Sequence, residues 1–119
     1  MIYRGLYMVL LTALLVGCYA DSSPIESAGA EYRHNRNYKS LEVIYKNLSP
    51  GMQRKEIERL LGEPDYSPGD GQDYYSSDRS VYVEDQEREV VVGLVVDYQD
   101  KNGAVTETLQ EFWLGPIGE

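Results

Sequence analysis

The chain has 119 residues, of which 42% are hydrophobic and 26% charged, a composition typical of one globular domain. The formal charge of −9 argues against nucleic-acid binding, which depends on neutralising phosphates with Lys and Arg. Residues 60–119 hold fourteen acids and three bases, a net charge of −11, whereas residues 18–59 carry +1. This asymmetry is typical of a solvated acidic face, and it also fits an acidic surface that selects a basic partner.

The N-terminus has the pattern of a secretory signal. Arg4 precedes an apolar run from Leu6 to Val16, which is too short to span a bilayer as a mature helix. Leu15-Val16-Gly17-Cys18 follows and resembles the lipobox of bacterial lipoproteins, in which the signal is cut before a lipidated cysteine. We therefore expect residues 1–17 to be a signal peptide and Cys18 to be lipidated. The alternative is an ordinary signal peptide, or a short anchor, with an incidental cysteine.

Residues 18–39 are predicted to be a flexible tether between the lipid and the folded domain. Residues 19–30 are rich in Ser, Ala, Gly and Pro without periodicity. Residues 31–39 are polar, and either continue the tether or form a contact segment, because Tyr and Arg are favoured in interface hot spots. His34 is the only histidine, so a histidine-based metal site is not expected.

Two short helices should open the folded domain, residues 40–119. The first is capped by Ser40 and ends before Pro50, and the second is capped by Gln53, with Glu56 completing an imperfect capping box. Both show apolar residues at helical spacing: Leu41, Ile44, Tyr45 and Leu48 in the first, and Met52, Ile57, Leu60 and Leu61 in the second. Gly62 and Pro64 should end the second helix. The two helices are expected to form an αα-hairpin, held by Ile57 and Leu60 packing on a sheet.

Three strands are predicted after an acidic loop at residues 65–73. The first covers residues 73–76 and can extend through 81–83, the second covers 90–98, and the third covers 104–114 after a turn at Asn102-Gly103. Alternation in the second strand places five residues on one face: Val90, Val92, Leu94, Val96 and Tyr98. The prediction is an α+β fold, in which two helices pack on one face of a three-stranded antiparallel meander.

The helix and strand motifs resemble those of a known family. Pro50-Gly51-Met52, then Leu60-Leu61-Gly62-Glu63-Pro64, a tyrosine-rich strand and a valine-rich hairpin resemble the SmpA/OmlA (BamE-like) family of small bacterial outer-membrane lipoproteins, over about residues 41–109. The resemblance implies the ααβββ fold shared with β-lactamase-inhibitor protein. It also implies accessory work in assembling outer-membrane β-barrel proteins, through binding to partner subunits and anionic lipid.

The resemblance assigns two sets of residues. The partner-binding positions that match the family are Tyr32, Arg33, Asn37 and Tyr38, and the structural motif consists of Gly51, Met52, Ile57, Leu60, Leu61, Gly62 and Pro64. Because the partner-binding positions precede the expected core, replacing Tyr32 and Arg33 should leave the thermal midpoint nearly unchanged.

The residue pattern favours a binding protein over an enzyme. The sequence contains no Gly-x-Ser-x-Gly, no Gly-rich phosphate loop and no carboxylate pair that stands out. Neither the acidic loop at residues 65–73 nor the acidic stretch at residues 97–103 has EF-hand spacing. We therefore expect no metal, and no motif indicates a cofactor. We predict a non-enzymatic outer-membrane lipoprotein that faces the periplasm and binds protein partners. The alternative is a periplasmic inhibitor or sensor that binds an enzyme or other basic partner through an acidic sheet face, which includes Asp70, Asp73, Glu87 and Glu89.

Overall fold

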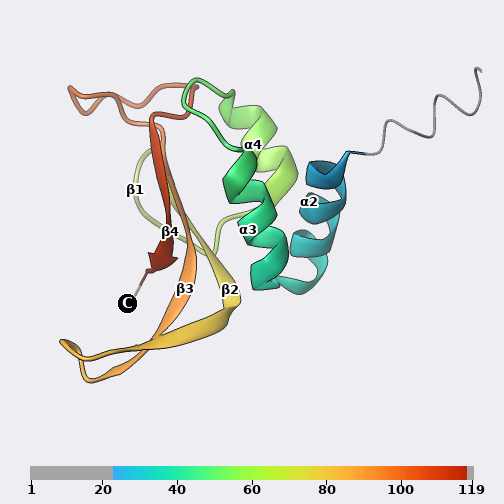
Figure 1. The fold of residues 1–119 in the computed structure, drawn as a ribbon. Helices are drawn as coiled ribbons and strands as arrows, with labels where there is room; N and C mark the ends of the chain where they lie inside the picture. The colour runs from blue at the N-terminus through green and yellow to red at the C-terminus, as the bar shows by residue number, and fades with distance from the viewer. Residues whose placement is uncertain (1–22, 118–119) are drawn as a thin grey trace, which may run out of the picture.

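The computed structural model describes residues 23–117, which form an α+β fold, so the predicted fold class is confirmed. The described elements are α2 (Pro24–Asn35), α3 (Tyr38–Asn47), α4 (Arg54–Leu61), β1 (Tyr66–Gly69), β2 (Gln72–Val83), β3 (Arg88–Asp97) and β4 (Glu111–Pro116). Figure 1 shows these helices on one side of an antiparallel sheet with the strand order β1-β2-β3-β4. The predicted count of two helices and three strands is wrong, because α2 and β1 lie in segments that were expected to be a tether and a loop.

Helix α2 occupies much of the predicted tether. The side chain of Ser23 accepts a hydrogen bond from the N–H of Glu26 (3.3 Å) and so caps the helix. The helix packs against both α3 and α4, and it buries Ala28, Gly29 and Tyr32. The tether prediction is therefore wrong for residues 24–39, and the folded domain begins near Ser23 rather than at Ser40.

Helices α2 and α4 approach each other closely at Gly29. A Cβ at this position would lie 3.1 Å from the carbonyl oxygen of Leu60 and 3.2 Å from its Cδ2. Leu60 is thus buried against α2, outside the core cluster that contains Ile57 and Leu61. The prediction that Leu60 packs on the sheet is wrong, because the helix that covers it was not foreseen.

An exposed ionic cluster joins the same two helices. Arg59 of α4 forms ion pairs of 2.6 Å with Glu26 of α2 and with Glu56. Hydrogen bonds from Arg59 hold the pKa of both carboxyls below the usual value. Glu56 therefore pairs with Arg59 and does not close the predicted capping box, and Gln53 makes no side-chain capping bond.

Helix α3 begins two residues before the predicted cap. Asn37 is the N-cap, and its Oδ1 accepts a hydrogen bond from the N–H of Ser40 (3.0 Å). Ser40 is therefore a buried residue of the first turn, and its prediction as the cap is wrong. The far end of α3 meets β4, where Tyr45 packs edge-to-face on Phe112 with ring centroids 5.7 Å apart.

Both ends of α4 are tied to strand segments. At its start, the N–H of Arg54 donates to the carbonyl of Glu107 (2.8 Å) and the N–H of Leu109 donates to the carbonyl of Met52 (2.8 Å). At its end, Gly62 has a φ of 80°, and its carbonyl accepts a hydrogen bond from the hydroxyl of Tyr75 (3.1 Å). These ties hold a helix that is too short to be stable alone in water.

The alternation predicted for the valine-rich strand is present in the structure. The five residues expected on one face are each at most 6% exposed and lie toward the helices: Val90, Val92, Leu94, Val96 and Tyr98. Three of them, Leu94, Val96 and Tyr98, share a core cluster with apolar side chains from all three helices: Tyr32, Leu41, Ile44, Ile57 and Leu61 are among these. Burial of these apolar side chains between the sheet and the helices is the main source of stability.

Strand β2 contains a bulge at the point where the sheet passes the helices. Ser76 pairs with Gly93 and Ser80 pairs with Val91, so three residues of β2 lie opposite one residue of β3. Beyond the bulge the β2–β3 hairpin projects away from the helices (Figure 1). Gly93 lies in close contact with β2 at this bulge, where a Cβ would overlap the carbonyl oxygen of Tyr75.

The third predicted strand starts later than expected. The turn at Asn102-Gly103 forms, with the N–H of Gly103 donating to the carbonyl of Asp100 (2.9 Å). However, Thr108 bridges to Gln53 at the start of α4 rather than continuing a ladder with β3. Strand β4 therefore begins only at Glu111, and it extends to Pro116, two residues beyond the predicted end at residue 114.

The three fully buried tyrosines, Tyr32, Tyr75 and Tyr98, give a prediction for alkaline pH. Burial raises the pKa of Tyr32 to about 12, and it also raises the pKa of Tyr75 and Tyr98. In the unfolded chain these groups ionise near pH 10, so the unfolded state binds fewer protons above that value. Stability is then lost as pH rises from about 10 toward 12. We expect near-UV absorbance to show that the buried tyrosines ionise in a cooperative step, which coincides with loss of helical circular dichroism. Ionisation of all the tyrosines near pH 10 with an intact fold would contradict this.

Candidate functional site

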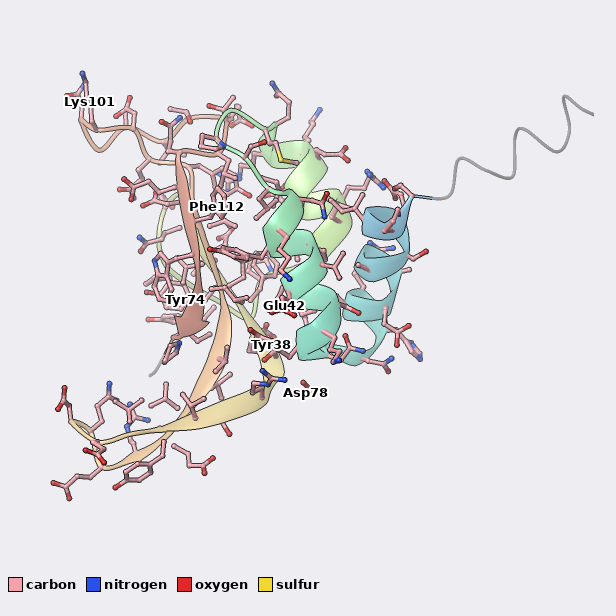
Figure 2. The ribbon with its side chains drawn as sticks, in the orientation of Figure 1. Tyr38, Glu42, Tyr74, Asp78, Lys101 and Phe112 are labelled. Carbon is pink, nitrogen blue, oxygen red and sulfur yellow. The ribbon has the colours of Figure 1, made fainter. Side chains whose placement is uncertain are left out.

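The helix-free face of the sheet carries a row of large side chains that crosses all four strands. Tyr66 of β1 pairs with Tyr74 of β2, Tyr74 pairs with Val95 of β3, and Val95 pairs with Trp113 of β4. We call these four residues the aromatic row. Figure 2 shows Tyr74 on the helix-free side, whereas Phe112, the residue before Trp113, points toward the helices.

The aromatic row is open to solvent at both ends. Tyr66 is 54% exposed and Trp113 is 45% exposed, and these values are among the highest for the large hydrophobic residues described. Tyr66 and Tyr74 pack edge-to-face with centroids 5.7 Å apart, which fixes the two rings relative to each other. Exposed, mutually ordered aromatic side chains are typical of protein-binding surfaces.

The row of residues next to the aromatic row has small side chains or none, and the side chain of Ile117 lies over its centre at Gly93. This row consists of Ser76, Gly93 and Gly115, which pair across β2, β3 and β4. A hollow of about 430 Å³ lies on this side of the sheet. Two rings of the aromatic row, Tyr66 and Tyr74, belong to its lining, and Trp113 does not. The other lining residues are Asp65, Ser76, Arg88, Glu89, Val91 and Ile117. A partner side chain can therefore enter the surface beside the aromatic rings.

On its other side the aromatic row is bordered by polar and acidic residues. Gln72, Asp97 and Glu111 pair across β2, β3 and β4, and we call them the acidic row. Asp97 accepts hydrogen bonds from the N–H of Gln99 (2.8 Å) and from the amide of Gln72 (3.3 Å). Glu111 is exposed, and within residues 23–117 it takes part in none of the four ion pairs. The potential around Trp113 is therefore expected to be negative.

Trp113 is the only tryptophan of the chain, so its fluorescence can measure this potential. We expect the cation Cs⁺ to quench Trp113 more efficiently than the anion I⁻, after each is normalised to a free tryptophan amide, because carboxylates attract cations within about 10 Å. Replacing Glu111 with Lys should shift the ratio toward I⁻. The same charge change at Glu42 of α3, on the helix side (Figure 2), is the matched control, and equal ratios in the two variants would contradict the prediction.

The four predicted partner-binding residues lie elsewhere, at the corner between α2 and α3. Tyr32 is fully buried, and its hydroxyl donates to the carbonyl of Ser76 (2.6 Å). Arg33 donates to the carbonyls of Arg59 (3.0 Å) and Leu60 (2.9 Å) at the end of α4.

The other two predicted residues join this corner to the bulge of β2. Asn37 caps α3, and the backbone N–H of Tyr38 donates to the carboxylate of Asp78 (2.9 Å). Arg79 lies over the ring of Tyr38, with 3.9 Å from guanidinium carbon to ring centroid. All four positions thus serve the fold, and the expectation that they precede the folded core is wrong.

The residues of the alternative acidic surface do not form one patch. Asp73 is only 4% exposed and faces the helices, where its carboxylate accepts a hydrogen bond from the hydroxyl of Ser67 (2.7 Å). Asp70, Glu87 and Glu89 are exposed, the first beside the β1–β2 turn and the others on the β2–β3 hairpin. Asp73 therefore does not belong to that surface.

Several sequence predictions concern residues outside this site. The signal peptide and Cys18 lie outside the described residues. Within residues 23–117, no helix is long and apolar enough to cross a membrane, and no group of three or more His, Cys, Asp or Glu could hold a metal ion. The structural-motif residues lie at the start of α4, in its buried face and in the loop after it.

Comparison with known protein families, with curated proteins and with solved structures finds no match. The resemblance to the SmpA/OmlA family therefore stays a prediction. The aromatic row was not foreseen. The sequence does place Trp113 between Phe112 and Leu114, and in a strand this position faces away from both neighbours.

Proposed function

We propose that this chain is a non-enzymatic, lipid-anchored protein of the bacterial cell envelope that binds a protein partner through the helix-free face of its sheet. The observation that carries the proposal is the aromatic row, whose end residues Tyr66 and Trp113 stay exposed while the three described helices lie on the opposite side of the sheet. Exposed Trp and Tyr are enriched at binding hot spots. The net charge of −11 over residues 60–119, which include the sheet, favours a partner with a basic surface.

The family resemblance supports a location and a class of partner. It favours the outer membrane, with the domain facing the periplasm, and subunits that assemble β-barrel proteins as partners, with anionic lipid as a further ligand. The inhibitor or sensor function is the second candidate, because the same exposed face could cover the cleft of a soluble enzyme. The location of the partner separates the two candidates: assembly subunits are in the membrane, and the enzyme is soluble.

Site-specific crosslinking in living cells tests the proposed face. A photo-reactive phenylalanine analogue at Trp113 should give a discrete adduct, and the same analogue at Lys55, which is exposed on α4, should give none. Mass spectrometry of the adduct then identifies a barrel-assembly subunit or a soluble enzyme. An adduct from Lys55 together with none from Trp113 would show that the helices, not the sheet, bind the partner.

The anchor has its own test. The sequence Leu15-Val16-Gly17-Cys18 after an apolar run predicts that the mature chain begins with an acylated Cys18. Mass spectrometry of the mature N-terminus should show the mass of diacylglycerol and a fatty acid on this cysteine, and Cys18→Ser should release the protein from the membrane. An unmodified Cys18, or cleavage at another position, would contradict the lipoprotein prediction.

A further inference from the structure

We propose that the helix-free face binds an extended basic segment of the partner, and that an Arg or Lys of this segment stacks on Trp113 and pairs with Glu111. This inference rests on the proposed function and adds the chemistry of the ligand. It follows from three properties of the described face: vacant aromatic rings, adjacent carboxylates, and a hollow two residues farther along the strands.

Among residues 23–117, no Arg or Lys stacks on the aromatic rings of this face, whereas three tyrosines elsewhere in the fold do carry an arginine. Three arginines stack on tyrosines within residues 23–117: Arg36 on Tyr32, Arg54 on Tyr98 and Arg79 on Tyr38, at 4.8, 4.6 and 3.9 Å from the ring centroids. Trp113, Tyr66 and Tyr74 take part in no such pair among the described residues. Trp offers the strongest attraction for a cation, so the exposed indole of Trp113 is the best available position for a guanidinium or ammonium group.

The acidic row lies directly beside this ring. Glu111 and Trp113 are two residues apart on β4, so their side chains share one face of the sheet. Glu111 also lies opposite Asp97 of β3, and like charges in this position repel each other. A partner cation over Trp113 would relieve that repulsion while it forms an ion pair with Glu111.

The negative charge of the chain from residue 60 onward selects against acidic ligands. Residues 60–117 contain thirteen acids and three bases, a net charge of −10. Arg88 is the only base that lines the hollow. An acidic segment would be repelled over the whole face, whereas a basic one is attracted before contact.

The hollow indicates that the segment is extended. In a strand, side chains two residues apart point the same way and are separated by about 6.6 Å, which is also the spacing between neighbouring rows of the sheet. A basic side chain over Trp113 therefore places the side chain two residues away above the row of Ser76, Gly93 and Gly115. The hollow begins at Ser76 of this row, and its apolar lining includes Val91 and Ile117, so an apolar residue is preferred at this point of the segment.

A peptide titration of the full-length lipidated protein tests the inference. The protein is placed in nanodiscs of zwitterionic phosphatidylcholine, which does not attract cations, and the probe is the capped peptide Thr-Leu-Thr-Arg-Thr-Leu-Thr-Arg-Thr. Fluorescence of Trp113 reports binding. Replacing each Arg of the peptide with citrulline keeps its shape and removes the charge, and we expect binding to weaken roughly 3- to 30-fold.

Protein variants provide the second half of the test. Glu111→Lys should weaken binding of the arginine peptide at least about threefold and leave binding of the citrulline peptide unchanged. The control Glu42→Lys makes the same charge change on α3 and should alter neither. Added salt should weaken only the arginine peptide.

The outcomes separate this inference from the proposed function. Equal binding of both peptides, or equal effects of Glu111→Lys and Glu42→Lys, would overturn the basic-segment inference while the face remains a binding surface. If neither peptide changes the fluorescence of Trp113, the inference also fails. The crosslinking experiment at Trp113 then decides the proposed function by itself.

Discussion

Replacing Tyr32 with Ala is expected to unfold most of the domain. Tyr32 is fully buried in the core, packs edge-to-face on Tyr75 with centroids 6.4 Å apart, and donates a hydrogen bond of 2.6 Å to the carbonyl of Ser76. Removing a buried aromatic side chain costs about 3–5 kcal/mol, and an unpaired buried carbonyl adds about 1–3 kcal/mol. Domains have roughly 5–15 kcal/mol of stability, and small ones lie near the low end because their cores are small, so little would remain.

Two further variants identify the cause of the loss. Tyr32→Phe keeps the ring and removes only the hydrogen bond, so it should cost about 1–3 kcal/mol and leave the domain folded. Tyr66→Ala removes an equal side chain that is 54% exposed and should change stability by less than about 1 kcal/mol. Circular dichroism during thermal unfolding measures all three. A thermal midpoint for Tyr32→Ala close to that of Tyr66→Ala would mean that α2 is not docked on the sheet.

Helix α2, which contains Tyr32, was not predicted from the sequence. Its signals for a helix are present: Ser23 and Glu26 have capping-box spacing, and Ile25, Ala28, Gly29 and Tyr32 recur at helical intervals. They are weak because two of these four residues are small, so the apolar stripe is narrow. The helix is stabilised by contacts with α3 and α4, which a local pattern cannot contain.

The end of α2 was hidden for a different reason. Helices commonly end at a glycine with positive φ, and Gly62 does so after α4. In α2 this position is occupied by Arg36, with a φ of 57°. Arg36 is held there by long-range contacts, since its carbonyl accepts a hydrogen bond from the N–H of Asp78 (3.0 Å). No stop signal therefore appears in the sequence.

The sheet was predicted well where its pattern is strong. The alternation of β3 was clear because every second residue is Val, Leu or Tyr and faces the core. Strand β1 was missed because Ser67-Pro68-Gly69 is typical of loops, although an edge strand tolerates proline. The aromatic row depends on the registers of three strand pairs. Irregularities in β1 and β2 and the long connection between β3 and β4 set those registers. Single-sequence reasoning could place Trp113 in a strand, but could not place it beside Tyr74.

The site and the fold meet at Gly93, and replacing Gly93 with Ala is the second change with a large expected effect. A Cβ at this position would overlap the carbonyl oxygen of Tyr75 and would lie 2.7 Å from Cδ1 of Ile117. The first obstacle is backbone of the neighbouring strand, so β2 and β3 would have to separate at the bulge. Overpacking in a core usually costs about 1–3 kcal/mol, and a backbone obstacle places this variant at about 3 kcal/mol or more.

The cross-strand partner of Gly93 is its natural control. Gly115 lies opposite Gly93 on β4, and a Cβ there would meet only ring carbons of Trp113, at 3.8 Å, an ordinary contact distance. Gly115→Ala should therefore change stability by less than about 1 kcal/mol, and it can stabilise by restricting the unfolded chain. Urea unfolding followed by the fluorescence of Trp113 compares the two variants directly. Equal urea midpoints would show that β2 and β3 are not so close at the bulge.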